Sequence, residues 1–284
     1  MIDLSTDSSP QAPNNRSRVL INTIPKAGTH LLEKVVRLLP GYDPSGQHIN
    51  QFLPADTLLQ SRSGEADNAF AEVPLDHLEA DILAIPLGQY ATAHLLYSDS
   101  IAVALQAWNI VLLSIVRDPR DIAISFVKYV AGLESHYLFP AYQRLSFDEQ
   151  LMTTIVGIPT PLSKYVPYIP TLMDIGAMVA AFLPWSRQRN VYTTTFEKLV
   201  GSQGGGSQRE QAIELRNIAR HIGLDCTEAE LAQVAEHIFG GSATFRKGTI
   251  GDWRNHFSPE HRAAFKQVAG QLLIDLGYET DPNW

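Results

Sequence analysis

Apolar positions along the chain form short continuous runs separated by longer stretches with helical spacing. The clearest runs are residues 19–21 (VLI) and 110–116 (IVLLSIV). Strands buried on both faces of a parallel sheet have such uninterrupted apolar sequences. Shorter runs at 90–95 and 190–196 are predicted to form two further strands.

Stretches with helical spacing lie between and after these runs. The predicted helices cover residues 31–39, 98–107, 119–130, 171–183, 209–222, 227–239 and 258–276. Asp118 is a good N-cap, Pro119 suits the first helical position, and Asp121 completes a pattern similar to a capping box. Because strands alternate with helices, we predict an α/β fold, with a central parallel β-sheet flanked by helices on both faces.

Three stretches lack this regularity. Residues 42–72 are rich in Gly, Pro, Asn, Ser and Asp, residues 132–170 combine prolines with aromatic residues, and residues 201–208 (GSQGGGSQ) resemble a flexible surface loop. We interpret the segments 40–90 and 131–170 as insertions that form the substrate pocket or a lid.

Length and composition favour a single domain. A chain of 284 residues that is 45% hydrophobic can bury a full core. We assign this domain to residues 17–284 and expect residues 1–16, which are polar, to form a disordered tail. Since no run approaches the ~18 apolar residues of a transmembrane helix, stable membrane insertion is not expected.

Charge and cysteine content narrow the range of functions. The formal net charge of −8 argues against a general binder of nucleic acid or anionic membranes. The lone Cys226 excludes an internal disulfide and a cysteine-rich metal site, and it fits a reducing, cytoplasmic location. The state of assembly is open, with a homodimer as one option.

Candidate chemistry first appears directly after the 19–21 run. Residues 25–29 (PKAGT) join the predicted strand to the first helix, which places backbone N–H groups at a positive helix end. That geometry suits a phosphate or sulfate. A Walker A loop reads GxxxxGK[ST], whereas here Lys26 precedes Gly28 and Thr29. The turn therefore has the features of a phosphate loop without the NTPase signature.

Two further segments suit anions. Arg117 follows the 110–116 run at its carboxyl end, where parallel sheets bind their ligands, and Ser125 lies eight residues later. Arg246 and Lys247 supply two cations beside Gly248, whose backbone N–H is unhindered. Three anion sites near strand ends indicate a nucleotide with more than one phosphate group.

These motifs resemble those of the sulfotransferase family that uses 3′-phosphoadenosine-5′-phosphosulfate (PAPS) as donor. The PKSGT loop of the family resembles residues 25–29, its Arg with a Ser eight residues later resembles Arg117 and Ser125, and its RKGxxGDW motif resembles residues 246–253. The resemblance implies a P-loop-NTPase-like sulfotransferase fold. It also implies in-line transfer of a sulfuryl group to a hydroxyl or amine of a small-molecule acceptor.

The resemblance assigns roles to individual residues. Lys26 would stabilise the departing phosphate, and His94, at the end of a short strand, would be the general base. The residues implied to bind the donor are Lys26, Ala27, Gly28, Thr29, His30, Leu31, Arg117, Ser125, Phe196, Phe245, Arg246, Lys247 and Gly248. No metal would be required, because lysine, arginine and amide dipoles neutralise the charge developing on the phosphate. His30 is equally compatible with an ordinary helix-face residue.

Three positions depart from the pattern of the family. Thr92 stands where the family often has a lysine two residues before the catalytic histidine, Leu31 stands where a tryptophan commonly stacks on adenine, and Phe196 replaces a usual tyrosine. Aromatic residues concentrated in 126–170 favour an apolar or aromatic acceptor, although an aromatic core explains them equally well.

Two other functions stay open on the sequence alone. A P-loop-type kinase or nucleotide hydrolase would need Mg²⁺ and a Walker-type Lys-Ser/Thr pair. A non-catalytic nucleotide-binding module would keep Arg117 and Arg246 but would have no use for both Lys26 and His94.

Overall fold

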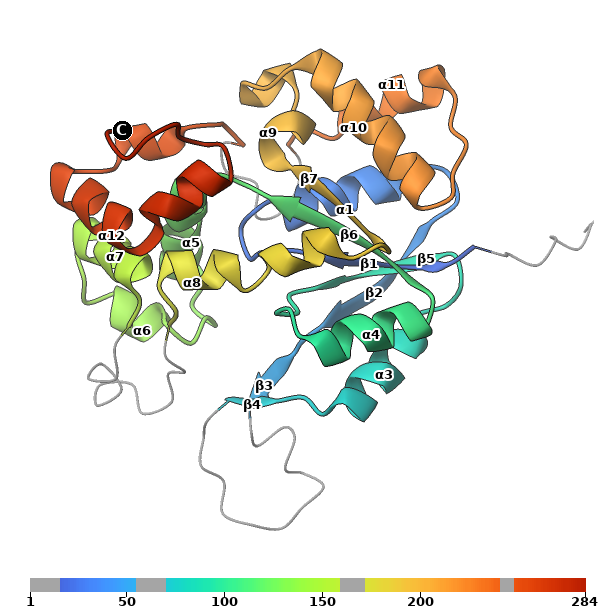
Figure 1. Ribbon diagram of the computed structural model, residues 1–284, viewed down its shortest axis with the longest axis horizontal. Helices are drawn as coiled ribbons and strands as arrows, with labels where there is room; N and C mark the ends of the chain where they lie inside the picture. Colours follow the sequence, from blue (N-terminus) through green and yellow to red (C-terminus); the bar gives the residue numbers. More distant parts are fainter. Residues whose placement is uncertain (1–15, 55–69, 159–171, 241–247) are drawn as a thin grey trace, which may run out of the picture.

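A parallel sheet lies at the centre of the molecule (Figure 1). The computed structural model describes residues 16–54, 70–158, 172–240 and 248–284. The sheet has five strands in the order β2-β5-β1-β6-β7, and every neighbouring pair is parallel. These strands are β1 (Arg18–Asn22), β2 (Asp43–Ile49), β5 (Gln89–Ala93), β6 (Ile110–Val116) and β7 (Val191–Thr195). A separate antiparallel pair is formed by β3 (Phe52–Pro54) and β4 (Phe70–Glu72).

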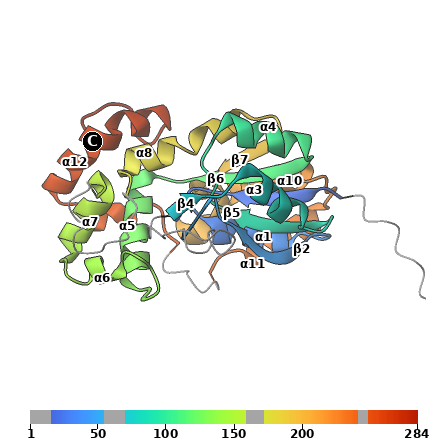
Figure 2. The same cartoon turned by 90° about the horizontal axis from the view of Figure 1, so that it is seen from below.

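Helices cover the sheet and extend beyond it. They are α1 (Thr29–Leu38), α3 (Leu75–Leu83), α4 (Asp99–Ala107), α5 (Pro119–Ala131), α6 (Phe139–Tyr142), α7 (Phe147–Val156), α8 (Ile175–Ala180), α9 (Phe196–Leu199), α10 (Gln208–His221), α11 (Glu228–His237) and α12 (Pro259–Asp275). The 3-10 helices in the described part of the chain are η2 (Leu183–Arg187), η3 (Ser202–Gly204) and η4 (Asp252–Asn255). Helices α1 and α4 lie on opposite sides of the sheet (Figures 1 and 2). Helices α5, α7, α8 and α12 pack together at the end of the sheet to which β6 points.

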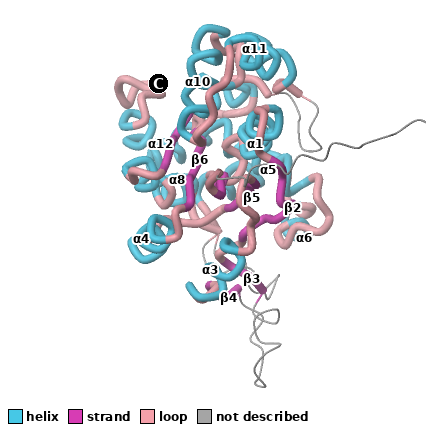
Figure 3. The backbone as a smooth tube through the Cα atoms, turned by 90° about the vertical axis from the view of Figure 1, so that its right-hand side faces the viewer, coloured by secondary structure: helices cyan, strands magenta, loops and turns pink. Residues whose placement is uncertain are grey.

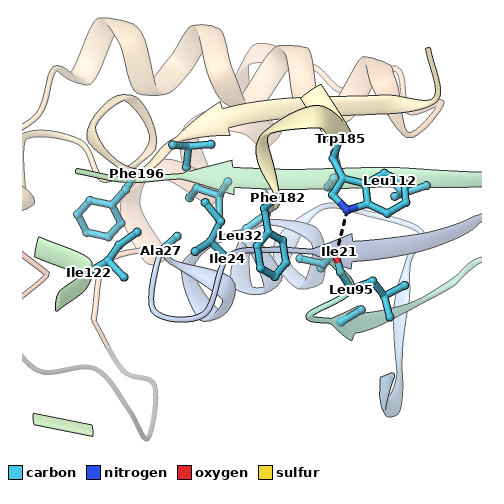
Figure 4. Packing of buried hydrophobic residues seen from close by; sticks show 14 of the residues in the cluster. Ile21, Ile24, Ala27, Leu32, Leu95, Leu112, Ile122, Phe182, Trp185 and Phe196 are labelled. Atoms are coloured by element: carbon cyan, nitrogen blue, oxygen red, sulfur yellow. Dashed lines mark hydrogen bonds between the residues drawn. The ribbon is translucent and has the colours of Figure 1, made fainter. Parts of the chain in front are cut away.

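The core is built on the two apolar central strands. Val19, Leu20 and Ile21 of β1 are fully buried, as the continuous apolar run predicts for a strand covered on both faces. The chain after β5 is fixed to this core by a polar bond, because the Trp185 Nε1–H donates to the Leu95 carbonyl at 2.9 Å (Figure 4). This bond ties the segment after β5 to η2, beside the edge of the sheet where the candidate residues lie.

The predicted fold class is confirmed. The runs at 19–21, 90–95, 110–116 and 190–196 form β1, β5, β6 and β7. Seven predicted helices correspond to α1, α4, α5, α8, α10, α11 and α12, although α8 is shorter than the prediction for 171–183. The predicted N-cap at Asp118 is also confirmed, since its side chain accepts a hydrogen bond from the Arg120 N–H.

Two stretches expected to be irregular contain regular elements, so that expectation was wrong for them. The 42–72 stretch contains β2, whose residues are mostly exposed because β2 is an edge strand with little apolar sequence. Helix α3, at residues 75–83, was also missed. The 132–170 stretch contains α6 and α7, the latter begun by a capping box of Ser146 and Glu149. The remainder of that stretch, from residue 159, lies outside the described residues.

The molecule has distinct ends. The β3–β4 pair and α3 lie at one end, and α10 and α11 lie at the other (Figures 1 and 3). Within the described ranges, no helix is both long and apolar enough to cross a bilayer.

Candidate active site

The turn between β1 and α1 places a cation beside a helix N-terminus. Gly28, the N-cap of α1, has a φ of 130°, and Lys26 has a φ of 67°. A positive φ is uncommon for a residue with a side chain, so the turn imposes this conformation on Lys26. Because Gly28 has no side chain with which to cap α1, the first helical N–H groups face the turn. This geometry suits an anion.

Lys26 lies half-buried against an aromatic ring. Its Nζ is 3.7 Å from the centroid of the Tyr129 ring on α5. Burial is the larger cause and the nearby positive charge of Arg117 the smaller one, and together they lower the pKa of Lys26 from 10.5 to about 8. Lys26 is therefore mostly protonated at neutral pH, close enough to Arg117 for the two charges to interact.

His94 follows β5 directly, and its ring orientation is defined. Its Nδ1 is 2.7 Å from the backbone oxygen of Thr23. A carbonyl oxygen can only accept, so Nδ1 carries the hydrogen and Nε2 keeps its lone pair. The pKa of His94 is lowered to about 4, mainly by burial and also by His48, Lys26 and His30, while the bond to Thr23 opposes the shift. The imidazole is therefore neutral at pH 7, with Nε2 able to accept a proton.

Thr23, which the sequence analysis did not single out, links this histidine to the phosphate-loop-like turn. It is fully buried, and its hydroxyl is 2.6 Å from the hydroxyl of Thr29 at the start of α1. Asn22 fixes the same edge, because its amide donates to the Leu95 carbonyl at 3.1 Å and accepts from the Leu95 N–H at 2.7 Å. Hydrogen bonds thus hold the segment after β5 in register with the carboxyl end of β1.

Arg117 leaves β6 at the same edge of the sheet. Its Nη2 donates to the Thr249 carbonyl at 3.1 Å, and its guanidinium lies 4.1 Å from the centroid of the Phe196 ring. Asp121, four residues later in the first turn of α5, is 3.8 Å from the same Nη2. Ser125 lies a further turn along α5 and is half-buried. The structure therefore places residues 248–253, the described part of the 245–253 segment, next to the 117–125 segment, as the sequence predicts.

Asp121 does not act as a capping box residue, contrary to the prediction. Its carboxylate accepts from the Gly251 N–H at 2.7 Å and from the Trp253 N–H at 2.9 Å. The Asp118 N–H, which a capping box would satisfy, instead donates to Glu197 at 3.0 Å. The Asp121 carboxylate bonds to the 248–253 loop, which brings two N–H groups to it, and not to the Asp118 N–H at the start of its own helix.

The loop at 248–253 also packs against a cluster on its far side. Arg120 is buried and forms ion pairs with Asp118, at 2.8 Å, and with Glu279. The Arg120 guanidinium lies 3.9 Å from the ring of Trp253 and 4.6 Å from that of Trp284. Trp253 is thereby a packing anchor for the loop.

A small pocket lies between α1, α9 and the segment that follows α11. It is lined by His30, Leu31, Lys34, Phe196, Val200, Ile238, Phe239, Gly240 and Gly248. The structure thus brings together His30, Leu31, Phe196 and Gly248, which the sequence analysis proposed as donor-binding residues. Lys34 was missed, although it lies one helical turn after His30 and Leu31; its Nζ donates to the Gly240 carbonyl at 2.8 Å.

Segment 201–208 is not simply a flexible surface loop. Gly204 is buried, and its carbonyl accepts from the Ile250 N–H at 3.0 Å. A side chain at Gly204 would lie 2.5 Å from the Gly248 carbonyl, so the segment packs directly against the 248–253 loop. Of the remaining predicted site residues, Phe245, Arg246 and Lys247 lie outside the described residues.

An aromatic group borders Lys26 on the side of α5. The His136 ring stacks on Tyr137 at 4.6 Å and meets the Tyr129 ring edge-on at 5.6 Å. Burial, assisted by the charge of Lys26, lowers the pKa of His136 to about 4. These residues come from the aromatic-rich stretch noted in the sequence.

Comparison with known proteins identifies the family. The family model for the sulfotransferase domain matches residues 16–277. The chain belongs to the sulfotransferase family. This confirms the predicted family and the enzyme class, transfer of a sulfuryl group. A search of curated proteins found no match.

Solved structures of sulfotransferases share the fold. Mouse sulfotransferase SULT7A1 complexed with PAP has a TM-score of 0.59 and 18% identity, over 94% of this chain and 88% of that chain. Retinol dehydratase in a complex with retinol and PAP has a TM-score of 0.57 and 16% identity, over 94% and 83%. Retinol dehydratase with androsterone and inactive cofactor PAP has a TM-score of 0.56 and 16% identity, over 91% and 81%. Because the sequence identities are this low, the similarity shows a shared fold and nothing further.

Proposed function

We propose that this sulfotransferase moves a sulfuryl group from PAPS to a hydroxyl or amine of a small-molecule acceptor. The observation that carries the proposal is the convergence of Lys26, His94 and Arg117 where β1, β5 and β6 end. Ligands of open parallel sheets bind at this edge. The PAP bound in the three similar structures supports the choice of donor.

His94 is proposed to be the general base. As the acceptor oxygen or nitrogen bonds to sulfur, the bond from sulfur to the bridging phosphate oxygen breaks, and the acceptor proton passes to Nε2 of His94. The hydrogen bond from Nδ1 to the Thr23 carbonyl supports this role, because it leaves Nε2 unprotonated and orients the ring.

Lys26 is proposed to stabilise the phosphate that leaves. Its ammonium group is positive at neutral pH and half-buried, and a charge in a partly desolvated site acts more strongly than one in bulk water. Contact with Tyr129 holds the side chain at the turn. Transfer would then need no metal, since Lys26, Arg117 and the N–H groups of the turn supply the positive potential.

The donor nucleotide is proposed to bind across the remaining site. The backbone of Ala27, Gly28 and Thr29 at the start of α1 fits a 5′-phosphate. Arg117, Ser125 and Gly248 are proposed to bind the 3′-phosphate. The motif resemblance assigns Arg246 and Lys247, which lie outside the described residues, to the same phosphate. The pocket at Leu31 and Phe196 fits adenine through apolar contact, with His30 at its rim.

The acceptor is proposed to be small and apolar or aromatic. Tyr129, His136 and Tyr137 border Lys26 with ring surfaces that would contact such a molecule. Two of the similar structures contain retinol or androsterone, which agrees with an apolar acceptor.

Transfer of radiolabelled sulfate from PAPS to a mixed acceptor library tests the proposal. We expect products heavier than their acceptors by one SO₃ group, and formation that is insensitive to EDTA. A kinase or nucleotide hydrolase would instead need Mg²⁺ and an NTP. PAP binding without any sulfated product would indicate a non-catalytic module.

A further inference from the structure

His48 contacts the candidate base from the neighbouring strand. It lies on the edge strand β2, opposite Thr92 in the β2–β5 register. Its Nδ1 is 2.8 Å from the Thr92 hydroxyl, and its ring is 5.0 Å from that of His94, at an interplanar angle of 67°. Thr92 and His94 are two residues apart at the end of β5, a spacing that places side chains on the same face of a strand.

The local backbone explains how an exposed edge residue reaches this position. The register of β2 against β5 shifts between Pro44 and His48. Gly46, within the shift, has a φ of 76°. Such irregularities redirect side chains at sheet edges and near active sites. Without the shift, another residue of β2 would face Thr92.

We propose that His48 is a positioning residue for sulfuryl transfer, which holds the His94 imidazole with Nε2 toward the acceptor. This inference rests on the function proposed above. The Thr23 carbonyl fixes one nitrogen of His94 but leaves the ring free to tilt about that bond. His48, itself anchored by Thr92, supports the ring from the side.

The pKa of His94 reports on this contact, because it depends on the charged groups nearby. His48 from β2, Lys26 from the turn and His30 from α1 all disfavour a proton on His94. Replacing His48 by Ala admits water and removes one of these groups. The pKa of His94 should therefore rise above its value of about 4. A loss of packing elsewhere in the protein would not produce this shift.

Three variants and a control separate the contributions. His48→Ala removes both the ring contact and the hydrogen bond, Thr92→Val removes only the hydrogen bond, and His48→Asn keeps a polar group near the Nδ1 position. His77→Ala, at an exposed position on α3, is the control. Single-turnover rates are measured, because steady-state kcat can report product release.

We expect His48→Ala to lower the single-turnover rate about tenfold, since a misplaced catalytic group costs up to about 10²-fold. Affinity for PAP should not change. Thr92→Val should lower the rate by a smaller factor, with little further effect in the His48→Ala background, and His48→Asn should recover part of the rate. His77→Ala should match the wild type. A wild-type rate in His48→Ala would overturn the proposal.

NMR of ¹⁵N-histidine-labelled protein tests the proposed role of His48 without an activity assay. In both proteins we expect His94 as the Nδ1–H tautomer, which the Thr23 carbonyl selects, and in His48→Ala a raised pKa of His94. An unchanged pKa of His94 would refute the role of His48. Absence of sulfuryl transfer by the wild type would instead refute the proposed function and leave the NMR result valid.

Discussion

Lys26 and His94 have displaced pKa values that, in the proposed mechanism, set two limits on activity. Burial is the main cause for both, and it lowers both values, because each group is positively charged when protonated. His94 must be neutral to accept a proton, which holds above about pH 4, and Lys26 must be charged, which holds below about pH 8. The two residues are therefore in their required states together at neutral pH.

We expect a bell-shaped pH profile of kcat/KM, which reports the free enzyme. The acid limb should lie near pH 4 and the basic limb near pH 8. Lys26→Arg should abolish the basic limb, since arginine stays charged, although its rate will be lower because the guanidinium is larger. A basic limb that persists near pH 8 in Lys26→Arg would assign that limb to another group.

Gly28 shows how the site depends on one backbone conformation. Its φ of 130° is unfavourable for other residues, and an added Cβ would lie 3.0 Å from Ile115 Cδ1 and 3.1 Å from Phe196 Cδ2. Gly28→Ala should destabilise the protein by about 1–3 kcal/mol and weaken PAP binding. Gly223→Ala is the matched control, with a φ of 79° and open space around the added Cβ. Equal losses of stability in the two variants, measured by urea unfolding, would contradict the packing argument.

At the scale of elements, Asp121 couples helix α5 to the 248–253 loop. It accepts hydrogen bonds from two loop N–H groups, Gly251 and Trp253. Bonds to a charged group contribute about 1.5–3 kcal/mol each, so their loss should loosen the loop substantially.

Asp121→Ala should therefore raise the Kd for PAP at least tenfold, as one such bond alone corresponds to about that factor. Isothermal titration calorimetry measures the change. Asp76→Asn, an exposed substitution on α3, should leave the Kd unchanged. Wild-type affinity in Asp121→Ala would show that the anchored loop does not hold the nucleotide.

Elements with strong local patterns could be predicted from the sequence. β6 is a continuous apolar run, and α5 begins with the Asp118 cap and Pro119. β2 could not be predicted, because an exposed edge strand needs no apolar pattern and is formed by pairing with β5. The role of Asp121 was mispredicted for a similar reason. Its partners lie about 130 residues away in sequence, and only the fold brings them near.

The candidate site was predictable where a motif carried it. Lys26 and Arg117 were singled out by their positions after strands, and His94 was assigned by the family resemblance. The structure places all three at one edge of the sheet. Thr23 and His48 were not found, because their contacts with Thr29, Thr92 and His94 depend on strand register. Register between distant strands is a property of the folded chain.

At the scale of the whole molecule, two histidines link stability to pH. His94 and His136 have pKa values lowered from 6.5 to about 4, so between these values the unfolded chain binds more protons than the folded protein. Their contribution to stability is fully present above pH 6.5 and is lost as the pH falls through 4.

The free energy of unfolding should therefore fall by about 1–3 kcal/mol per histidine as the pH is lowered through this range. The double variant His94→Asn, His136→Phe should show a shallower fall in urea titrations. Because Asp121 and Glu197 have pKa values raised by burial, they act in the opposite direction, and the difference between variant and wild type isolates the histidines. Equal slopes would show that neither histidine is held neutral by the fold.

The most direct test of the account compares the wild type with His94→Asn, a variant whose amide can still donate to the Thr23 carbonyl. Both proteins are assayed for PAP binding and for transfer of labelled sulfate from PAPS to an acceptor that the wild type sulfates. We predict that the variant binds PAP with wild-type affinity and transfers sulfate at least 10²-fold more slowly, as loss of a general base requires. Wild-type transfer by the variant would contradict the account.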